Sequence, residues 1–521
     1  MRQATGKHPI VQALRVHLVL AAAMLAACAE LPSRPAGPEE VAIAPAEGGE
    51  LDRQISPAEI RHPGESGFRL IKEGTQAFVV RMQSARLAAR SLDVQTYIWH
   101  ADVTGIYLAG VLLESADRGV RVRLLVDDLD ARAKNDGFAA LAAHPNIEVR
   151  MFNPFVTRKG TLAKAGEGAL NFNRINRRMH NKSWIADNRI AFVGGRNVGD
   201  EYFGAGDEMN FVDLDFAMIG PVVRDVSASF DRFWNSPSAY PMELLDADAV
   251  NDAALAALRQ RLSAQAEGAA ATRYAEALRG DDLVQRMLAG ESPMQWSAKY
   301  EFVSDDPAKV TMKKRDVKRT HVGVTLVPMI QGAEASVTIV SPYFVPGDAV
   351  TDGLARAAGE GKTVRILTNS LVANDVAAVH GGYSRYRKPL LKGGVQLWEL
   401  KPTAGSTQGS SLFGSSGASL HTKAFAVDGK SLFVGSYNLD PRSTWLNCEQ
   451  GVLVEDAVLA KQLDELFELQ TTGQHAWRVD LVDGSLHWSD GTEEFDRDPQ
   501  ASGWRRFQAW ATRVLHLDAQ L

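Results

Sequence analysis

The chain has 521 residues, of which 45% are hydrophobic and 23% are charged, a composition that is ordinary for a globular protein. This length is sufficient for two or three domains. The net charge of -6 argues against wholesale nucleic-acid binding, because proteins that hold nucleic acid normally carry a basic balance or a basic face.

The N-terminal residues 1–28 have the three-part form of a secretory signal: basic residues, an apolar run over 18–27, and a small-residue motif that ends at Cys28. A run of this length is too short to span a bilayer, which requires about 20 apolar residues. The motif Leu25-Ala26-Ala27-Cys28 resembles the bacterial lipobox. That resemblance implies a lipid anchor on Cys28 and a membrane-anchored lipoprotein that faces the periplasm or the cell exterior. A short uncleaved signal anchor is the alternative.

The next segment, residues 29–64, is rich in proline, alanine and glutamate, and this composition predicts a disordered tether. The chain has two cysteines, so with Cys28 assigned to lipid only Cys448 remains. No intramolecular disulfide is then available, and stability must come from packing. We expect Cys448 to be a small buried hydrophobic residue rather than a nucleophile.

Two stretches, 65–245 and 321–475, share one order of expected elements. In the first, the pattern predicts a helix over 76–90, a strand over 91–98, a helix over 105–118 and a strand over 119–126. In the second, it predicts a strand over 336–340, a helix over 348–360 and a strand over 361–367. Strands that alternate with helices indicate βαβ units and parallel sheets covered on both faces. The fold class is therefore α/β, with two similar domains in one chain related by pseudo-two-fold symmetry.

Residues 246–320 separate these halves, and the pattern predicts helix in their first part and irregular structure over 301–319. The basic cluster at 313–315 is expected to be solvated surface, with contact to anionic headgroups as the alternative. Residues 476–521 predict a hairpin around Asp483-Gly484 and an amphipathic helix over 504–517. We expect this helix to dock on the core, with a membrane interface as the alternative.

The strongest signal is the pattern H-x-K-x4-D, which occurs once in each half. The first copy contains His180, Lys182 and Asp187, and the second contains His421, Lys423 and Asp428. Each copy leads into a similar exit, Gly194-Gly195-Arg196-Asn197 in the first half and Gly435-Ser436-Tyr437-Asn438 in the second. A lone H-x-K would indicate only a half-exposed strand, but its recurrence with shared flanking spacing predicts two matched half-sites.

Each motif is also expected to form a hairpin, because apolar and polar residues alternate up to the aspartate and a second β-like run follows. Asp428-Gly429 is typical of a type I′ turn, and Asp187-Asn188 is compatible with one. Residues i and i+2 of a strand share a face, so the histidine and lysine of each motif should lie on a common exposed face. The two aspartates are better placed to hold backbone at the hairpin end than to do chemistry.

Two histidines, two lysines and two asparagines around one phosphate-sized anion are suited to phosphoryl transfer. A neutral imidazole can attack phosphorus, while a protonated imidazole on the other side gives its proton to the leaving alkoxide. The non-bridging oxygens would be bound by Lys182, Lys423, Asn197 and Asn438, so neither a metal nor a cofactor is required. Asp213 and Glu449 can accept a hydrogen bond from the imidazoles and fix their tautomer, a surface carboxylate being the alternative for each.

The motif H-x-K-x4-D followed by G-S-x-N resembles the signature of the phospholipase D superfamily, over residues 65–475 and in both halves. The stretches 196–204 and 438–443 are similar to the bacterial cardiolipin synthases, most of all to those of the C type. The resemblance implies transfer of a phosphatidyl group to phosphatidylglycerol from a second phospholipid, phosphatidylethanolamine or phosphatidylglycerol, through a phosphohistidine. It carries over to His180 as nucleophile, His421 as general acid and then base, Lys182, Asp187, Asn197, Lys423, Asp428, Ser436 and Asn438. Gly195 stands where the family has a serine.

Two other functions compete with this one. In a hydrolase of the same superfamily, a phospholipase or a nuclease, water replaces the lipid alcohol. Lipid tethering and the acidic balance favour phospholipid over nucleic acid, since nucleases need a basic track for the backbone. A lipid-binding protein with a degenerate site is the third possibility, and the two intact motifs argue against it. We therefore expect phospholipid substrates and no nucleic-acid partner.

Overall fold

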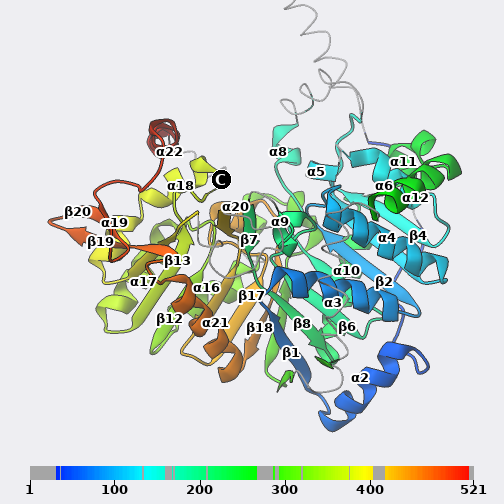
Figure 1. Cartoon of the computed structure of the whole chain (residues 1–521), viewed down its shortest axis with the longest axis horizontal. Coiled ribbons are helices and arrows are strands. Elements are labelled where there is room, and N and C mark those ends of the chain that lie inside the picture. The colour runs from blue at the N-terminus through cyan, green and yellow to red at the C-terminus, as the bar shows by residue number, and fades with distance from the viewer. Residues whose placement is uncertain are drawn as a thin grey trace, which may run out of the picture.

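The computed structural model describes residues 31–35, 37–131, 134–158, 167, 171–206, 209–266, 286–287, 293–317, 321–374, 376–402 and 417–515. The expected signal sequence over 1–28, with Cys28, lies outside these residues. Within the described part of the chain, no helix combines the length and the apolar character needed to cross a membrane. The two halves of the chain lie next to each other, each built around its own sheet (Figure 1).

The sheet of the first half has nine strands in the described residues. Their order is β10 (Gln295–Ser297), β1 (Ser66–Ile71), β8 (Asp215–Ile219), β6 (Ile190–Gly194), β5 (Ser183–Ala186), β2 (Ser91–Thr96), β3 (Arg121–Asp127), β4 (Ile147–Phe152) and β9 (Ala239–Pro241). One face is covered by α3 (Gly74–Leu87), α4 (Val103–Asp117), α6 (Asn135–Ala142) and α12 (Asp252–Ala266), and the other by α10 (Pro221–Asn235). Strands β2 and β6 are buried at every residue because both faces are covered.

The sheet of the second half has ten strands in the same part of the chain. Their order is β11 (Tyr300–Ser304), β18 (Gln450–Glu455), β17 (Ser431–Gly435), β16 (Ala424–Val427), β12 (Ser336–Val340), β13 (Thr363–Asn369), β14 (Gln396–Leu400), β19 (Ala476–Val482), β20 (Ser485–Ser489) and β21 (Glu494–Phe495). One face is covered by α16 (Gly323–Gln331), α17 (Gly347–Gly359), α18 (Ala377–Ser384) and α19 (Arg387–Lys392), and the other by α21 (Ala457–Gln470).

A single apolar core joins the two halves. It contains buried residues from both sheets, such as Phe216 on β8 and Val434 on β17, together with residues of α10 and α21. The predicted fold class, two similar α/β domains in one chain, is therefore confirmed. The sheets are mixed rather than wholly parallel as expected: β2, β3 and β4 are parallel, as are β12, β13 and β14, but the motif hairpins join them antiparallel.

Both motif hairpins form as the alternating pattern predicted. Strand β5 pairs with β6 and strand β16 with β17, all antiparallel. The turn residues adopt the left-handed conformation that a type I′ turn requires, with φ of 53° at Asp187, 55° at Asn188, 56° at Asp428 and 61° at Gly429. These turns lie at the far end of each hairpin from the histidines.

The segment between the halves is less irregular than expected. It contributes β10 to the first sheet and β11 to the second, and most of β11 lies within the stretch 301–319 that was expected to be irregular. The remaining short elements of the described chain are α5 (Asp128–Ala131), α8 (Phe172–Ile175), α9 (Asp200–Phe203), α11 (Met242–Leu245), η2 (Ala247–Ala249), η3 (Pro307–Val310), α15 (Lys314–Val317) and α20 (Pro441–Trp445). Strands β19 and β20 form the expected C-terminal hairpin, which extends the second sheet.

For the residues of 29–64 that the structure describes, it corrects the expectation of a disordered tether. Helix α2 (Glu50–Arg61) docks on the first half, where Leu51 and Ile55 are fully buried in the core. Asp52 accepts hydrogen bonds from Arg90 at 2.6 Å and from Arg189 at 2.7 Å. The composition of this segment did not predict the helix, because a helix can dock with few apolar side chains when charged groups complete the contact.

We predict that Ile55→Ala lowers the free energy of unfolding by about 2–5 kcal/mol, the usual cost of a cavity in a packed core. Ile60→Ala on the same helix is the matched control, because Ile60 is 77% exposed and should contribute little. Chemical denaturation of the full chain measures both. Equal effects of the two substitutions would show that α2 is not docked in solution.

Candidate active site

Two short strands from different halves bring the motifs together. Strand β7 (Met209–Val212) pairs in parallel with β15 (Gly417–Leu420), and His421 N donates to Val212 O at 2.8 Å. The other motif makes the equivalent contact: Met179 forms a bridge with Cys448, and His180 N donates to Cys448 O at 2.8 Å. Each histidine therefore lies beside backbone of the opposite half.

This pairing places each histidine next to a carboxylate of the other half. His421 Nδ1 lies 2.6 Å from Asp213 Oδ2, and His180 Nδ1 lies 2.8 Å from Glu449 Oε2. Both carboxylates are buried. The sequence offered Asp213 and Glu449 as imidazole acceptors, and the structure brings each into that position, with the partners crossed between the halves.

The acceptors around His180 fix its tautomer. Nδ1 lies within hydrogen-bond distance of both Glu449 Oε2 and the carbonyl oxygen of Ser436, the latter at 3.1 Å. A carbonyl oxygen can only accept, so Nδ1 carries the proton and Nε2 keeps its lone pair. An imidazole held in this way is ready for nucleophilic attack through Nε2.

Burial controls the protonation of the site. It lowers the pKa of His180 to about 4, with Glu449 opposing the shift and Lys182 adding to it. Burial also lowers the pKa of His421 well below its ordinary value, and the charge of Lys423 adds to this effect. Both imidazoles are consequently neutral at pH 7. Burial lowers the pKa of Lys182 to about 7, an effect that the charge of Glu449 opposes.

The two carboxylates differ in their electrostatics. Burial by itself raises the pKa of Glu449, but its pairing with His180 and the hydrogen bonds that it accepts from His180 and Ser436 hold it below its ordinary value. Burial raises the pKa of Asp213, with Lys423 and Arg196 opposing. Glu449 therefore retains its negative charge more readily than Asp213.

His180 and both lysines are buried and His421 is only partly exposed, which corrects the expectation of an exposed hairpin face. His180 is 8% exposed, Lys182 3% and Lys423 1%. The reason is that both strands begin only after the lysine, so each H-x-K lies in the segment that enters the hairpin, under the opposite half. Lys182 Nζ donates to His180 O at 2.6 Å, and Lys423 Nζ makes the same contact with His421 O.

The residues of the two exits have different surroundings. Asn197 Nδ2 donates to the hydroxyl of Tyr202 at 2.9 Å, and its Oδ1 accepts from Ile98 N at 3.2 Å. The buried Oδ1 of Asn438 has no hydrogen-bond partner among the described residues. Ser436 Oγ donates to Glu449 Oε2 at 2.5 Å, so this serine holds the carboxylate that orients His180. Asn438 is thus the exit asparagine whose side-chain oxygen is left without a partner, whereas both side-chain polar atoms of Asn197 are hydrogen-bonded.

Gly195, where the resemblance led us to expect a serine, faces Asp213. A Cβ added at Gly195 would lie 2.3 Å from Asp213 Oδ1, whereas in the other half Ser436 contacts the longer Glu449 through its hydroxyl. Gly195 and Asp213 in the first half therefore occupy the space that Ser436 and Glu449 occupy in the second half. A serine at 195 would displace Asp213 from His421.

The motif aspartates hold backbone, as their turn positions predicted. Asp187 accepts hydrogen bonds from three successive amides, those of residues 89–91, at 2.7–2.9 Å. Asp428 accepts from the amides of residues 334–336 at 2.7–3.1 Å. Each aspartate fixes the start of the neighbouring parallel strand, at the end of the hairpin away from the histidine.

Three positioning residues were missed by sequence reasoning. Asp127, the last residue of β3, accepts from Arg178 Nε and Met179 N, both at 2.8 Å. Asn369, at the equivalent end of β13, exchanges two hydrogen bonds with the backbone of Leu420. Asp305 accepts from Glu449 N at 2.8 Å. A polar residue at the carboxyl end of a parallel strand was the signal available for the first two.

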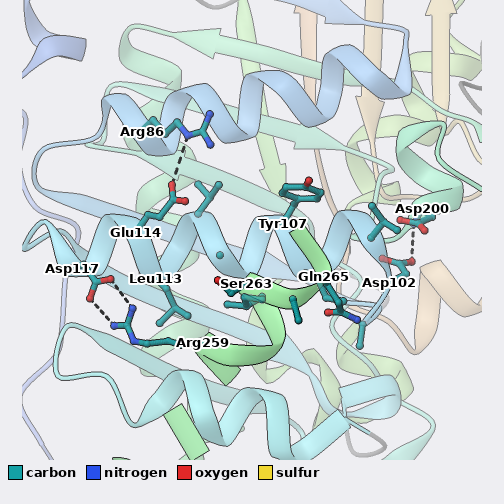
Figure 2. A pocket seen from close by; sticks show the side chains of 17 residues that line it. Arg86, Asp102, Tyr107, Leu113, Glu114, Asp117, Asp200, Arg259, Ser263 and Gln265 are labelled. Carbon is teal, nitrogen blue, oxygen red and sulfur yellow. Dashed lines mark hydrogen bonds and ion pairs between the residues drawn. The ribbon is translucent and has the colours of Figure 1, made fainter. Parts of the chain in front are cut away.

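A large cavity lies apart from this chemistry. It has a volume of about 880 Å³, lies between α3, α4 and α12, and contains neither motif histidine. Figure 2 shows ion pairs on its walls, Arg86 with Glu114 and Asp117 with Arg259. We therefore locate the candidate site by the side-chain geometry of the motifs and not by cavity size.

Two groups of metal-ligand side chains come together in the described part of the chain, and neither includes a motif residue. One consists of His100, Asp102 and Glu201, and the other of His380, Glu399 and Asp498. In the second group the guanidinium of Arg387 already lies between the carboxylates, 2.8 Å from Glu399 and 2.7 Å from Asp498. This arginine supplies the positive charge that a metal would bring there.

Comparisons with known proteins agree with the geometry. The family model described as "Cardiolipin synthase, PLD-like domain" matches residues 79–234 and 326–470. Cardiolipin synthase C of Escherichia coli (strain K12) is 40% identical over 477 residues, which cover 90% of this chain and 99% of that protein. An uncharacterized protein of Helicobacter pylori (strain J99 / ATCC 700824) is 31% identical and covers 83% of this chain and 84% of its own length.

Among solved structures, phosphatidylserine synthase of Haemophilus influenzae Rd KW20 has a TM-score of 0.55. The match covers 90% of this chain and 100% of that one, at 12% sequence identity. An identity this low supports the fold alone.

We predict a bell-shaped pH dependence of kcat/KM for a phosphodiester substrate. Activity should rise with pH through a limb near about 4, because His180 must lose its proton to attack. It should fall through a limb near about 7, because Lys182 must be charged to hold the phosphate. In Lys182→Arg the cation stays charged, so the alkaline limb should move upward while the acid limb stays. An alkaline limb that is unchanged in this active variant would contradict the role of Lys182.

Proposed function

The chain belongs to the cardiolipin synthase family and is a phosphatidyltransferase of the phospholipase D superfamily, and on that premise we propose that it makes cardiolipin. The acceptor is phosphatidylglycerol, and the donor is phosphatidylethanolamine or a second phosphatidylglycerol. The observation that carries the proposal is the crossed pair of imidazoles, each held by a buried carboxylate of the opposite half. Such a pair can attack phosphorus from one side and serve the leaving and entering alcohols on the other.

In the first step, Nε2 of His180 attacks the phosphorus of the donor lipid, and the bond from phosphorus to the headgroup oxygen breaks. His421 gives its proton to that oxygen, and ethanolamine or glycerol leaves. His421 is neutral in the free protein, so it must take up this proton as the donor binds, since an anionic phosphate beside an imidazole raises its pKa. The product of the step is a phosphatidyl-histidine.

In the second step, His421 removes the proton from the free glycerol hydroxyl of phosphatidylglycerol. The resulting oxygen attacks phosphorus, the bond to His180 breaks, and cardiolipin is released. Lys182 and Lys423 stabilise the charge on the non-bridging oxygens in both steps, and Asn438 contributes its amide. Atoms and protons balance over the two steps without a further reactant.

The choice of His180 as nucleophile is supported by its carboxylate. Glu449 retains its charge more readily than Asp213, and a charged acceptor on Nδ1 increases the electron density at Nε2. Asp213, whose pKa burial raises, is better suited to an imidazole that must alternate between its two protonation states. The resemblance to the superfamily leads to the same assignment.

The test is the product formed in vesicles that contain phosphatidylglycerol and phosphatidylethanolamine. We expect cardiolipin with release of ethanolamine or glycerol, and a phosphate label that can be trapped on histidine. His180→Ala should form neither product nor labelled protein. Phosphatidic acid as the sole phosphorus-containing product, in vesicles and in detergent alike, would establish the hydrolase instead.

We further propose that Cys28 carries a lipid anchor and that the catalytic halves face the periplasm or the cell exterior. Arg34 donates to the carbonyl oxygens of Ser236, at 2.5 Å, and Ala239, at 2.9 Å. The chain from Cys28 to Arg34 spans at most about 20 Å when extended. The anchor would therefore hold the first half close to the bilayer and not on a long tether.

Metabolic labelling with a fatty acid tests the anchor. We predict that the unsubstituted chain takes up label and is cleaved before Cys28, whereas Cys28→Ser remains an unlabelled precursor. The Cys28→Ser protein should keep its thermal unfolding temperature, because the described contacts begin after this residue. Undiminished acyl labelling of Cys28→Ser would rule the anchor out.

A further inference from the structure

The C-terminal helix α22 (Gly503–Leu515) docks on the second half through small residues. Ala509 and Thr512 are buried against α18, and a Cβ added at Gly381 would lie 2.4 Å from Ala509 O. Leu371 and Ala501 complete this small apolar cluster. The close approach at Gly381 fixes which side of α22 faces the protein. The helix docks as expected, but through these small residues and not through the face that carries Trp504 and Phe507.

The opposite side of α22 carries an aromatic row that faces solvent. Trp504 is 64% exposed, and Phe507 and Trp510 are each 51% exposed. Neighbouring rings in the row lie 5.5 Å and 5.9 Å apart between centroids. Large exposed aromatic groups that are contiguous on a folded surface mark a site of interaction.

A basic cavity lies beside this aromatic row. It has a volume of about 400 Å³ and is bounded by α18, α19, β20 and α22. Its charged lining consists of Arg387, Lys388, Arg497, Arg506 and Arg513, with Asp496 and Asp498 as the acidic residues. Arg387 is paired with Asp498, whereas Arg497 and Arg513 are exposed and make no side-chain hydrogen bond or ion pair among the described residues. The excess of positive charge suits an anionic phosphate group.

This surface is on the same edge of the molecule as the candidate active site. Asn369 is the last residue of β13 and binds the backbone of Leu420, the residue before His421. Two residues after Asn369, Leu371 lies beneath α22. Arg505 also donates to the carbonyl oxygen of Asn374 in the same segment. Figure 1 shows α22 and α18 along the upper edge, with α8 and α5 of the first half on that edge as well.

Two features of the first half extend this edge. Phe172, on the α8 turn that precedes the first motif, is 49% exposed. Arg34 binds the carbonyl of Ala239, which pairs with Phe152 at the carboxyl end of β4, so the first described residues also lie at this edge. An anchor before Arg34, the aromatic row and the histidines can thus all face one surface.

We propose that the aromatic row and the basic cavity form a docking surface for a bilayer that contains anionic phospholipid. Tryptophan favours the membrane interface, where its ring lies among acyl chains while its N–H stays hydrated, and arginines beside it meet the phosphates. The proposal rests on the proposed function in one respect: a lipid substrate requires the histidines to be at a membrane. Docking through α22 turns the active-site edge toward that membrane.

A fluorescent reporter on Phe507→Cys tests the docking locally, whatever anchors the rest of the chain. The environment-sensitive label should shift to the blue and brighten several-fold when vesicles of phosphatidylglycerol and phosphatidylethanolamine are added to the full chain. Val458→Cys on α21 is the matched control, since Val458 is 49% exposed and α21 lies at the lower edge in Figure 1. The unsubstituted chain controls for labelling of Cys28, because Cys448 is buried. An equal response at the two positions would overturn the proposal.

The anionic preference has its own test in the same assay. Arg497→Glu combined with Arg513→Glu should raise the phosphatidylglycerol vesicle concentration needed for half of the response by roughly tenfold or more. Phosphatidylcholine vesicles should give a weak response that this double variant does not change. An unchanged response of the double variant to phosphatidylglycerol would overturn the role of the basic cavity. Measuring the label response in the His180→Ala background separates docking from turnover. If the labelled chain responds to vesicles but the unsubstituted chain makes no cardiolipin, only the proposed function is contradicted.

Discussion

The protein depends on one constraint: each motif imidazole needs an acceptor for its Nδ1 proton, and that acceptor belongs to the other half. His180 depends on Glu449, and His421 depends on Asp213. A buried imidazole without such a partner would have an unsatisfied N–H and no defined tautomer. The parallel pairing of β7 with β15, the bridge of Met179 with Cys448 and the shared core between the sheets all maintain this arrangement.

Sequence reasoning reached the parts of this arrangement that depend on local chemistry. The Asp428-Gly429 turn requires positive φ at both residues, and the pair was identified for that reason. The acceptor roles of Asp213 and Glu449 followed from residue type. Their crossing did not, because β7 and β15 are too short for a periodic signal and pair over a long sequence separation. Helix α2 was missed because its contact relies on Asp52 and only a few apolar residues.

The two half-sites are similar but not equivalent. Asp127 in the first half corresponds to the uncharged Asn369 in the second. Likewise, Gly195 with Asp213 corresponds to Ser436 with Glu449. These differences give the two imidazoles different electrostatic surroundings within a common backbone frame. A symmetric pair would give both histidines the same surroundings, whereas in the observed pair Glu449 retains its charge more readily than Asp213.

The crossed acceptors also order the appearance of activity during synthesis of the chain. The first half can be complete, with His180 and Asp213 both translated, while His180 still lacks its carboxylate. Glu449 is the last of the four residues to be made, and its amide is held by Asp305 from the segment between the halves. In a nascent chain that ends before residue 449, the imidazole of His180 therefore has no carboxylate at its Nδ1. The complete pair of held imidazoles forms only when the second half has folded against the first.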